Sequence, residues 1–297
     1  MILSPADSER YYRIWWPLLS LVNTRANLVS DFPKNPKKSG ISPEVAFKVR
    51  DALWGSPEYL NEFIEANPAK LNKADLAVAA SWSRRVSGNF IIMKHLKKHS
   101  IFLLDSEKPS AFGVLGLMSP IDEVTPYSPP FMVQAVLLPF EGKIIYDGLL
   151  LPYSVSFGGN IRRGFSQRLR TATELGGLIT SLEPEDQEET QTDAIIDGNR
   201  KIMVDFRKDL VKSGLSENKV GEHFASVETF VKSYLLKQNP PVSLLRVTTE
   251  DLKHYFAWQG NKANRVSFKR LVKFLLNSER IDWDAAEAMD YFLKNLK

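Results

Sequence analysis

The sequence predicts an α+β protein in which a helical N-terminal region carries a small antiparallel sheet or open barrel and is followed by a separate helical bundle. Three observations predict this class. Helix-start signals recur through residues 1–87, and β-branched and aromatic runs separated by turn residues follow them. Apolar residues at helical spacing then return after an acidic stretch.

Composition places the chain among ordinary globular proteins. It has 297 residues, which corresponds to about two domains, and 43% of them are hydrophobic and 25% charged. The absence of cysteine excludes disulfides, thiolate metal sites and cysteine nucleophiles, and only four histidines are present for imidazole chemistry. We see no secretory signal and no apolar run of membrane-spanning length, so a cytoplasmic protein is expected.

Helix-start signals divide the N-terminal region. Ser4-Pro5, Ser42-Pro43 and Ser56-Pro57 each place a capping residue before a proline, which suits the first position of a helix. Asn72 begins a fourth helix in the same way, less strictly. The expected helices are residues 5–29, 43–54, 57–66 and 73–86.

Four aromatic residues crowd the first of these helices: Tyr11, Tyr12, Trp15 and Trp16. Exposed rings of this kind can stack on nucleobases. On an amphipathic helix, however, they more often form core or interdomain contacts.

The β unit follows. Its clearest element is a hairpin of residues 133–140 and 144–152 about Glu141-Gly142-Lys143, where glycine can supply a positive φ. A further strand is expected over Tyr153–Phe157. Gly158-Gly159-Asn160 then ends the β unit, and a new helix starts at Ile161.

The best domain boundary is the segment 183–193, which contains six acidic residues and no basic one. Low hydrophobicity and like charge favour a solvated linker. We therefore expect a first domain over residues 1–182 and a helical bundle over residues 194–297.

About five helices are expected in that bundle. Ser216 and Ser267 are taken as the starts of two helices, Thr248 with Asp251 as a capping box, and Asp282 as the start of the last helix.

Residues 200–285 resemble the SAM-like helical core-binding domain of tyrosine recombinases and phage integrases. The segments that carry the resemblance are FRKDLVKSGLSENKVGEHFASVETFVKSYLL, LLRVTTEDLKHYFAW and FKRLVKFLLNSERI. In that family this domain helps to clamp DNA while a second domain carries out catalysis with a His-x-x-Arg motif. No histidine of this sequence begins such a motif, so the resemblance implies only the DNA-contacting role. The hairpin LLPFEGKIIYDGLL is similar to segments of uncharacterised bacterial proteins, which implies no function.

Basic residues are the strongest functional signal in the bundle. Residues 199–297 contain 18 Lys and Arg against 12 Asp and Glu, a net charge of +6. The candidate nucleic-acid-binding residues are Lys262, Arg265, Lys269, Arg270 and Lys273. Arg270 and Lys273 share a helix edge, which can contact phosphates without reading base sequence. The alternative is a solvated charged face.

A second, less specific candidate is an anion site at the start of the helix after the β unit. Gly158 and Gly159 could expose backbone N–H groups at a helix N-terminus, with Arg162 and Arg163 beside them. The segment lacks the Gly-Lys-Ser/Thr of a P-loop, and a glycine turn is the simpler interpretation.

Acidic and histidine residues offer two further alternatives. Asp147, with Asp122 and Glu123, could form a hydrolytic site if the three carboxylates converge. The simpler interpretation is that Asp147-Gly148 is a bend in the strand, where the carboxylate accepts local backbone hydrogen bonds. His95 and His99 could share a helix face and bind a metal, but the run of residues there predicts a strand.

We therefore expect a non-enzymatic cytoplasmic factor that binds nucleic acid (DNA or RNA) or a protein through its C-terminal bundle. One alternative is a hydrolytic enzyme with its site between the β unit and the N-terminal helices. Another is an adaptor that oligomerises through the aromatic first helix. No cofactor, metal or membrane association is expected, and the oligomeric state is left open.

Overall fold

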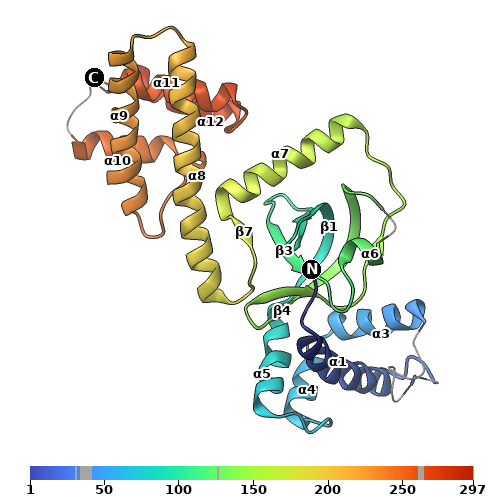
Figure 1. Ribbon diagram of the computed structural model, residues 1–297. Coiled ribbons are helices and arrows are strands. Elements are labelled where there is room, and N and C mark those ends of the chain that lie inside the picture. Colours follow the sequence, from blue (N-terminus) through green and yellow to red (C-terminus); the bar gives the residue numbers. More distant parts are fainter. Residues whose placement is uncertain (31, 34–41, 126, 260–263, 297) are drawn as a thin grey trace. The chain divides into compact units, whose positions relative to one another are not determined.

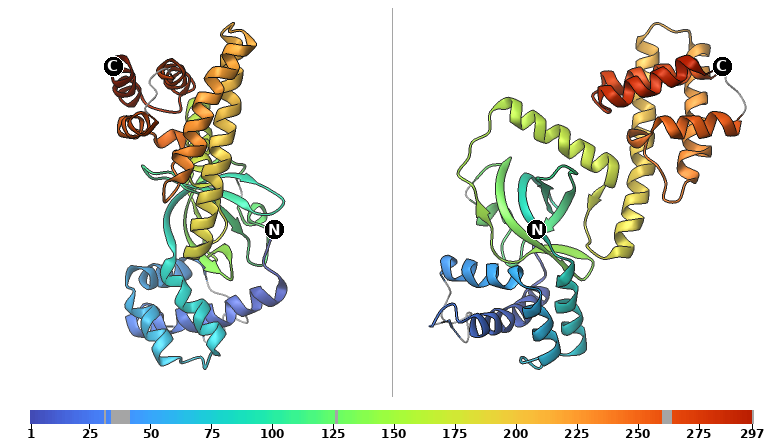
Figure 2. Two further views of the ribbon diagram at one scale, coloured as in Figure 1. Left: turned by 90° about the vertical axis from the view of Figure 1, so that its left-hand side faces the viewer. Right: turned by 180° about the vertical axis from the view of Figure 1, so that it is seen from behind.

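The computed structural model describes residues 1–30, 32–33, 42–125, 127–259 and 264–296, and it confirms the α+β class. The chain forms two compact units. The first comprises residues 1–169 and 178–187, and the second comprises residues 170–177 and 188–297. Figures 1 and 2 show the elements of each unit.

Four helices gather at one end of a sheet in the first unit (Figures 1 and 2). They are α1 (Pro5–Ala26), α3 (Pro43–Gly55), α4 (Glu58–Ala66) and α5 (Lys73–Ser81), with a short 3-10 turn η1 (Trp82–Arg84). The side chains of Ser4, Ser42 and Asn72 cap three of them, as the sequence predicts. The first helix ends earlier than predicted because Asn27 adopts the left-handed conformation at its C-cap.

Five strands close into a barrel. They are β1 (Val86–His95), β2 (Ser100–Leu104), β3 (Ala111–Leu115), β4 (Phe131–Phe140) and β5 (Lys143–Tyr146). Each strand pairs with two others in the ring β1-β2-β3-β5-β4-β1, and only the β3–β5 pair within this ring is parallel. This is the Greek-key order of an OB-type barrel. A closed ring also leaves no free edge among these five strands.

The predicted hairpin is confirmed by β4 and β5, which turn at Glu141 and Gly142 with φ values of 49° and 69°. The second arm stops at Tyr146, because Asp147 and Gly148 bend the chain, and only the two-residue strand β6 (Leu151–Pro152) returns to β4. The strand predicted over residues 153–157 is wrong. These residues are mostly exposed and, beyond the Tyr153 amide bonded to Met132, form no ladder with the barrel.

Helix α7 (Gly159–Gly176) follows, and its first part crosses the barrel on the side away from α1 and α3–α5 (Figures 1 and 2). Phe165 is buried there, and Arg168 bonds Asp105 Oδ1 at 2.8 Å and the Ser106 carbonyl in the β2–β3 loop. The helix ends at Gly177, whose φ is 71°, before β7 (Leu178–Ile179) pairs in parallel with β3. A short helix α6 (Ile121–Val124) lies between β3 and β4 in the chain.

The acidic segment is not an extended linker. Helix α8 (Pro184–Lys212) contains almost all of residues 183–193, and the boundary between the two units falls inside it, after Gln187. Charge and low hydrophobicity suggested a linker, but this sequence also starts with proline and is rich in glutamate and glutamine, which have high helix propensity. The second unit also takes residues 170–177, which the sequence assigned to the first domain.

The second unit is a helical bundle, as predicted. After α8 come α9 (Glu217–Ser233), α10 (Thr249–Gln259), α11 (Arg265–Asn277) and α12 (Trp283–Asn295), with 3-10 turns η2 (Leu235–Lys237) and η3 (Leu244–Arg246). The predicted capping box is present, because the Thr248 amide donates to Asp251 Oδ2 at 2.8 Å and the Asp251 amide donates to Thr248 Oγ1 at 3.2 Å. Asp282 likewise caps α12.

Each unit has its own core. Barrel and helix residues such as Trp82, Phe90, Phe102 and Phe140 form the core of the first unit. The core of the second unit contains residues only from Ile202 to Leu293, among them Phe206, Phe230 and Phe268. The aromatic residues of α1 belong to the first core. Tyr11 and Trp15 are fully buried, and Tyr12 and Trp16 pack against it while partly exposed.

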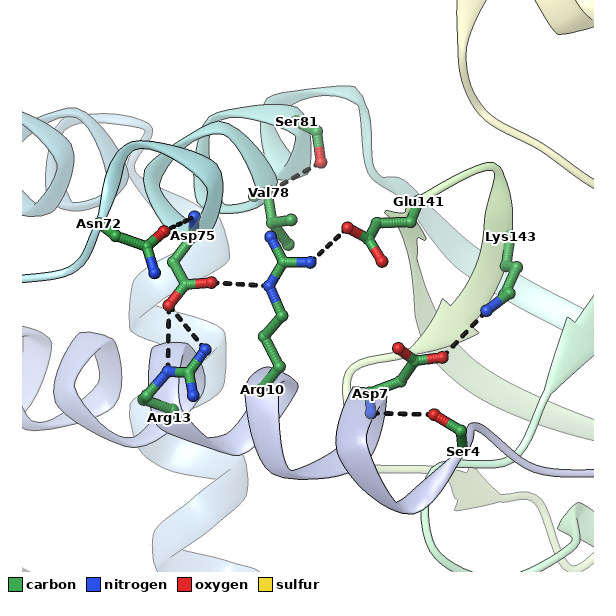
Figure 3. A network of polar contacts seen from close by, with 10 residues as sticks. All are labelled: Ser4, Asp7, Arg10, Arg13, Asn72, Asp75, Val78, Ser81, Glu141 and Lys143. Carbon is green, nitrogen blue, oxygen red and sulfur yellow. Dashed lines mark hydrogen bonds and ion pairs between the residues drawn. The ribbon is translucent and has the colours of Figure 1, made fainter.

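An ionic network around one buried carboxylate joins α1 to α5 and to the β4–β5 turn (Figure 3). Asp75 on α5 is 2% exposed and accepts hydrogen bonds from Arg10 Nε at 2.6 Å and from Arg13 Nη2 at 2.8 Å. Arg10 also pairs with Glu141 in the turn, and Lys143 Nζ lies 3.0 Å from Asp7 Oδ2. The network therefore joins the helical end of the unit to the barrel.

Candidate nucleic-acid interface

Helix α11 brings the basic cluster of the bundle onto one exposed arc. Phe268, Leu271, Val272 and Leu275 face the core. Ser267 and Phe274 are buried as well, and at 100° per residue the positions that are left form an outward arc of about 140°. That arc holds Arg265 and Lys273, which are exposed, and Lys269 and Arg270, which are partly exposed. We call these four residues the α11 cationic face. Lys262, also predicted for this site, lies outside the described residues.

The start of α11 differs from the sequence prediction. Asn264 is the N-cap residue, and Ser267, predicted to open the helix, lies inside its first turn and is 4% exposed. Its Oγ is 3.0 Å from His223 Nδ1 on α9. Burial and the neighbouring Arg270 lower the pKa of His223. Ser267 therefore packs α11 against α9, a role that local sequence does not reveal.

The cations of α11 differ from those of the neighbouring helices in having no acid on their own helix. Residues 265–277 contain no Asp or Glu. On other helices of the bundle, lysines pair with acids one turn away, as in Lys219–Glu222 at 2.6 Å, Lys232–Glu228 at 2.9 Å and Lys253–Glu250 at 3.0 Å. Within the described part of the chain, Lys269, Arg270 and Lys273 make no ion pair. Their charge is therefore available to a ligand.

A groove of about 440 Å³ lies between α11 and α12 beside this face. From α11, Lys269, Val272 and Lys273 line it; from α12, Trp283, Glu287 and Asp290 do. Trp283 is 62% exposed although it is the first residue of α12. Sequence reasoning did not single out Trp283. Its place after the cap Asp282 can be read from the sequence, but its exposure depends on how α12 packs on α11.

The predicted anion site is exposed, but local contacts hold its arginines. Arg162 Nε donates to the Phe157 carbonyl at 3.0 Å, and Arg163 Nη2 donates to Asn160 Oδ1 at 2.6 Å. Gly158 and Gly159 have open space where a side chain would be. The structure thus places the four predicted residues together at the start of α7, with both guanidinium groups bonded to the turn itself.

Asp147 lies at the base of the barrel, where it is fully buried. Its carboxylate accepts hydrogen bonds from Trp54 Nε1 at 3.0 Å and from the Leu149 amide at 3.2 Å, and Arg50 Nε lies 3.5 Å away. Burial raises the pKa of Asp147 to about 6, although Arg50 and Trp54 oppose that rise. Asp147 has no exposed surface, so it cannot reach a substrate in solution. Its bond to the Leu149 amide fixes the bend after β5, and its contacts with Trp54 and Arg50 join that bend to α3.

The other acids and histidines do not complete a site with Asp147. Asp122 and Glu123 are exposed on α6. His95 ends β1 and His99 lies in the β1–β2 turn, where His95 Nδ1 is 2.8 Å from Ser100 Oγ. Burial lowers the pKa of both histidines. Across the described residues, no three His, Asp or Glu side chains are grouped so that they could hold a metal ion.

Comparison with known proteins gives no family for this chain. No family model, no curated protein and no solved structure matches it. Where the structure describes the chain, it contains no helix with the length and apolar character needed to cross a bilayer. The functional argument therefore depends on the geometry of the described residues.

Proposed function

We propose that the protein associates with nucleic acid through the α11 cationic face. The observation that carries this proposal is that the exposed Lys273 and the partly exposed Lys269 and Arg270 share the outward arc of α11, with no acid on their helix and no ion pair within the described residues. Elsewhere in the bundle, cations such as Lys219 and Lys253 are neutralised one turn away. A row of Lys and Arg with no acid on its own helix suits the repeated charges of a phosphate backbone, and Glu287 and Asp290 of α12 line the groove beside it.

The expected mode of binding is contact with phosphates rather than with base edges. Lysine contacts phosphate as a point charge, and such contacts position a protein on nucleic acid without reading its sequence. The resemblance of residues 200–285 to a DNA-clamping helical domain supports the same role, because α11 falls within that segment. We therefore expect little discrimination between sequences of equal length and strandedness.

Fluorescence anisotropy with labelled single- and double-stranded DNA and RNA over a salt series tests this proposal. For duplex DNA, the logarithm of the affinity should fall with the logarithm of salt by about 0.9 for each phosphate neutralised. Changing Lys269, Arg270 and Lys273 together to Glu should weaken binding to all sequences alike and flatten that slope.

A charge-matched control separates the site from net charge. The variant with Lys219, Lys232 and Lys253 changed to Glu undergoes the same change in net charge, but at positions that are ion-paired in the structure. It should retain most of the affinity. If the wild-type protein does not bind at low salt, or if both variants lose binding equally, the α11 cationic face is only a solvated surface.

A further inference from the structure

A second groove lies on a different part of the bundle, between α8 and α9, which run side by side (Figures 1 and 2). It has a volume of about 560 Å³ and is lined by Val204, Arg207, Lys208, Val211, Lys212 and Phe224. Val204 is 49% exposed and Val211 is 59% exposed. They lie seven positions apart on α8, so they stand on one face of the helix about two turns, or roughly 10 Å, apart.

Cations border this apolar floor, and the described residues that line it include no acid. The Arg207 guanidinium lies 5.6 Å from the centre of the Phe224 ring, which holds the charge at the groove edge. Lys212 lies in the last turn of α8, and Lys208 pairs with Asp205 at 3.5 Å. The groove therefore combines two exposed aliphatic side chains with a positive rim.

We propose that this groove docks an acidic amphipathic helix of a partner protein. The two valines provide apolar contacts at the spacing of two helical turns, which matches the i and i+7 positions of a facing helix. Arg207, Lys208 and Lys212 complement carboxylates beside that apolar stripe. Nucleic acid would use the cations but would leave the valines without a partner. The groove thus supplies a protein-binding activity separate from the phosphate contacts proposed for α11.

The test uses the full chain and a fluorescein-labelled helical peptide of 14 residues. This peptide carries leucines at one-face positions i, i+3, i+7 and i+10, and glutamates at the positions beside them. Two further peptides serve as probes: one has the same composition with the leucines scattered around the helix, and one has lysine in place of glutamate. Fluorescence anisotropy at physiological salt gives the affinities.

We expect the acidic amphipathic peptide to bind at least about tenfold more tightly than either other peptide. Changing Val204 and Val211 together to Asp should reduce that affinity about tenfold or more. Changing Arg207 and Lys212 together to Glu should reduce it similarly and favour the lysine peptide. Val266→Asp is the matched control, because Val266 is 48% exposed but lies on α11, outside the groove. It should leave the affinity unchanged.

Four results would overturn the proposal. The first is equal binding of the amphipathic and scattered peptides, and the second is no binding by the wild-type protein. The third is a loss of affinity for DNA or anionic vesicles, rather than for the peptide, in the valine variant. The fourth is a dimer of the chain in sedimentation that the valine variant abolishes, because a second copy would then occupy the groove.

Discussion

In the first unit, Asp75 and Asp147 are buried beneath the N-terminal helices, where arginines and a tryptophan satisfy them. In the second unit, by contrast, no carboxylate is buried among the described residues. The buried guanidinium of Arg280 there pairs with Asp205, which is 39% exposed, at 2.7 Å. The first unit thus has charged side chains that are buried and paired, whereas the second unit has cationic side chains at its surface along α8 and α11. Removal of one partner from a buried ion pair destabilises a fold strongly, whereas a charge on the surface contributes little to stability and is available for binding.

The largest expected effect tests the internal use of charge. Asp75→Ala should lower the free energy of unfolding by about 3 kcal/mol, because it removes the buried carboxylate that Arg10 and Arg13 share and leaves the largely buried Arg10 paired with the more exposed Glu141. Urea denaturation followed by circular dichroism measures the change. Glu222→Ala is the matched change in the second unit, where the exposed pair with Lys219 should contribute less than about 1 kcal/mol. Equal losses in the two variants would remove the contrast between the units.

The next effect depends on pH. The pKa of Asp147 is about 6 in the folded chain, above the ordinary aspartate value of 3.8, so the folded state binds this proton more tightly. The contribution of Asp147 to stability is therefore fully present below pH 3.8 and is lost as pH rises through 6, by at most about 3 kcal/mol.

Asp147→Asn isolates this contribution, because it removes the titration and keeps the shape of the side chain. The stability of the wild-type protein minus that of the variant should fall between pH 4 and pH 7. The histidines with lowered pKa act in the opposite direction over part of this range, but they are present in both proteins and cancel. A difference that is flat or that rises with pH would show that Asp147 titrates normally.

A smaller effect is expected at a helix cap of the second unit. Asp282 Oδ1 accepts a hydrogen bond from the Ala285 amide at 2.7 Å, so Asp282→Ala should cost about 1 kcal/mol in a denaturant titration. Ser216 is the N-cap of α9 but makes no capping bond with its side chain. Ser216→Ala should therefore cost only a few tenths of a kcal/mol. A larger loss at Ser216 than at Asp282 would contradict this assignment.

A small effect on stability is also expected at the α11 cationic face. Changing Lys269, Arg270 and Lys273 to Glu should alter the free energy of unfolding by less than about 1 kcal/mol, because no ion pair within the described residues is lost. The same variant should lose affinity for nucleic acid. A loss of several kcal/mol would show that these cations hold the bundle together instead.

Local features of the fold could be predicted from the sequence. Ser4 and Asn72 begin helices because their side chains bond backbone amides three residues later, and the Thr248–Asp251 capping box spans the same distance. Gly142 marks the β4–β5 turn because its positive φ is a local requirement. The basic cluster could also be found from the sequence, since Lys269 and Lys273 lie one helical turn apart.

Other features could not be predicted because they depend on residues far apart in the chain. Ser267 was taken as a cap, but His223, 44 positions away, holds it inside a helix. Asp147 gives no local sign of burial, and its partner Trp54 is 93 positions away. Closure of the barrel likewise depends on the pairing of β1 with β4.

The sequence by itself therefore determined the α+β class, most helix starts, the main hairpin and the position of the cationic cluster. These depend on interactions within about four residues, which the order of side chains specifies directly. Only the tertiary structure decided that Asp147 is buried, that Ser267 lies inside a helix against His223, and that Val204 and Val211 face solvent beside Phe224. Burial and exposure are set by which distant surfaces pack together, and the order of residues does not state that packing.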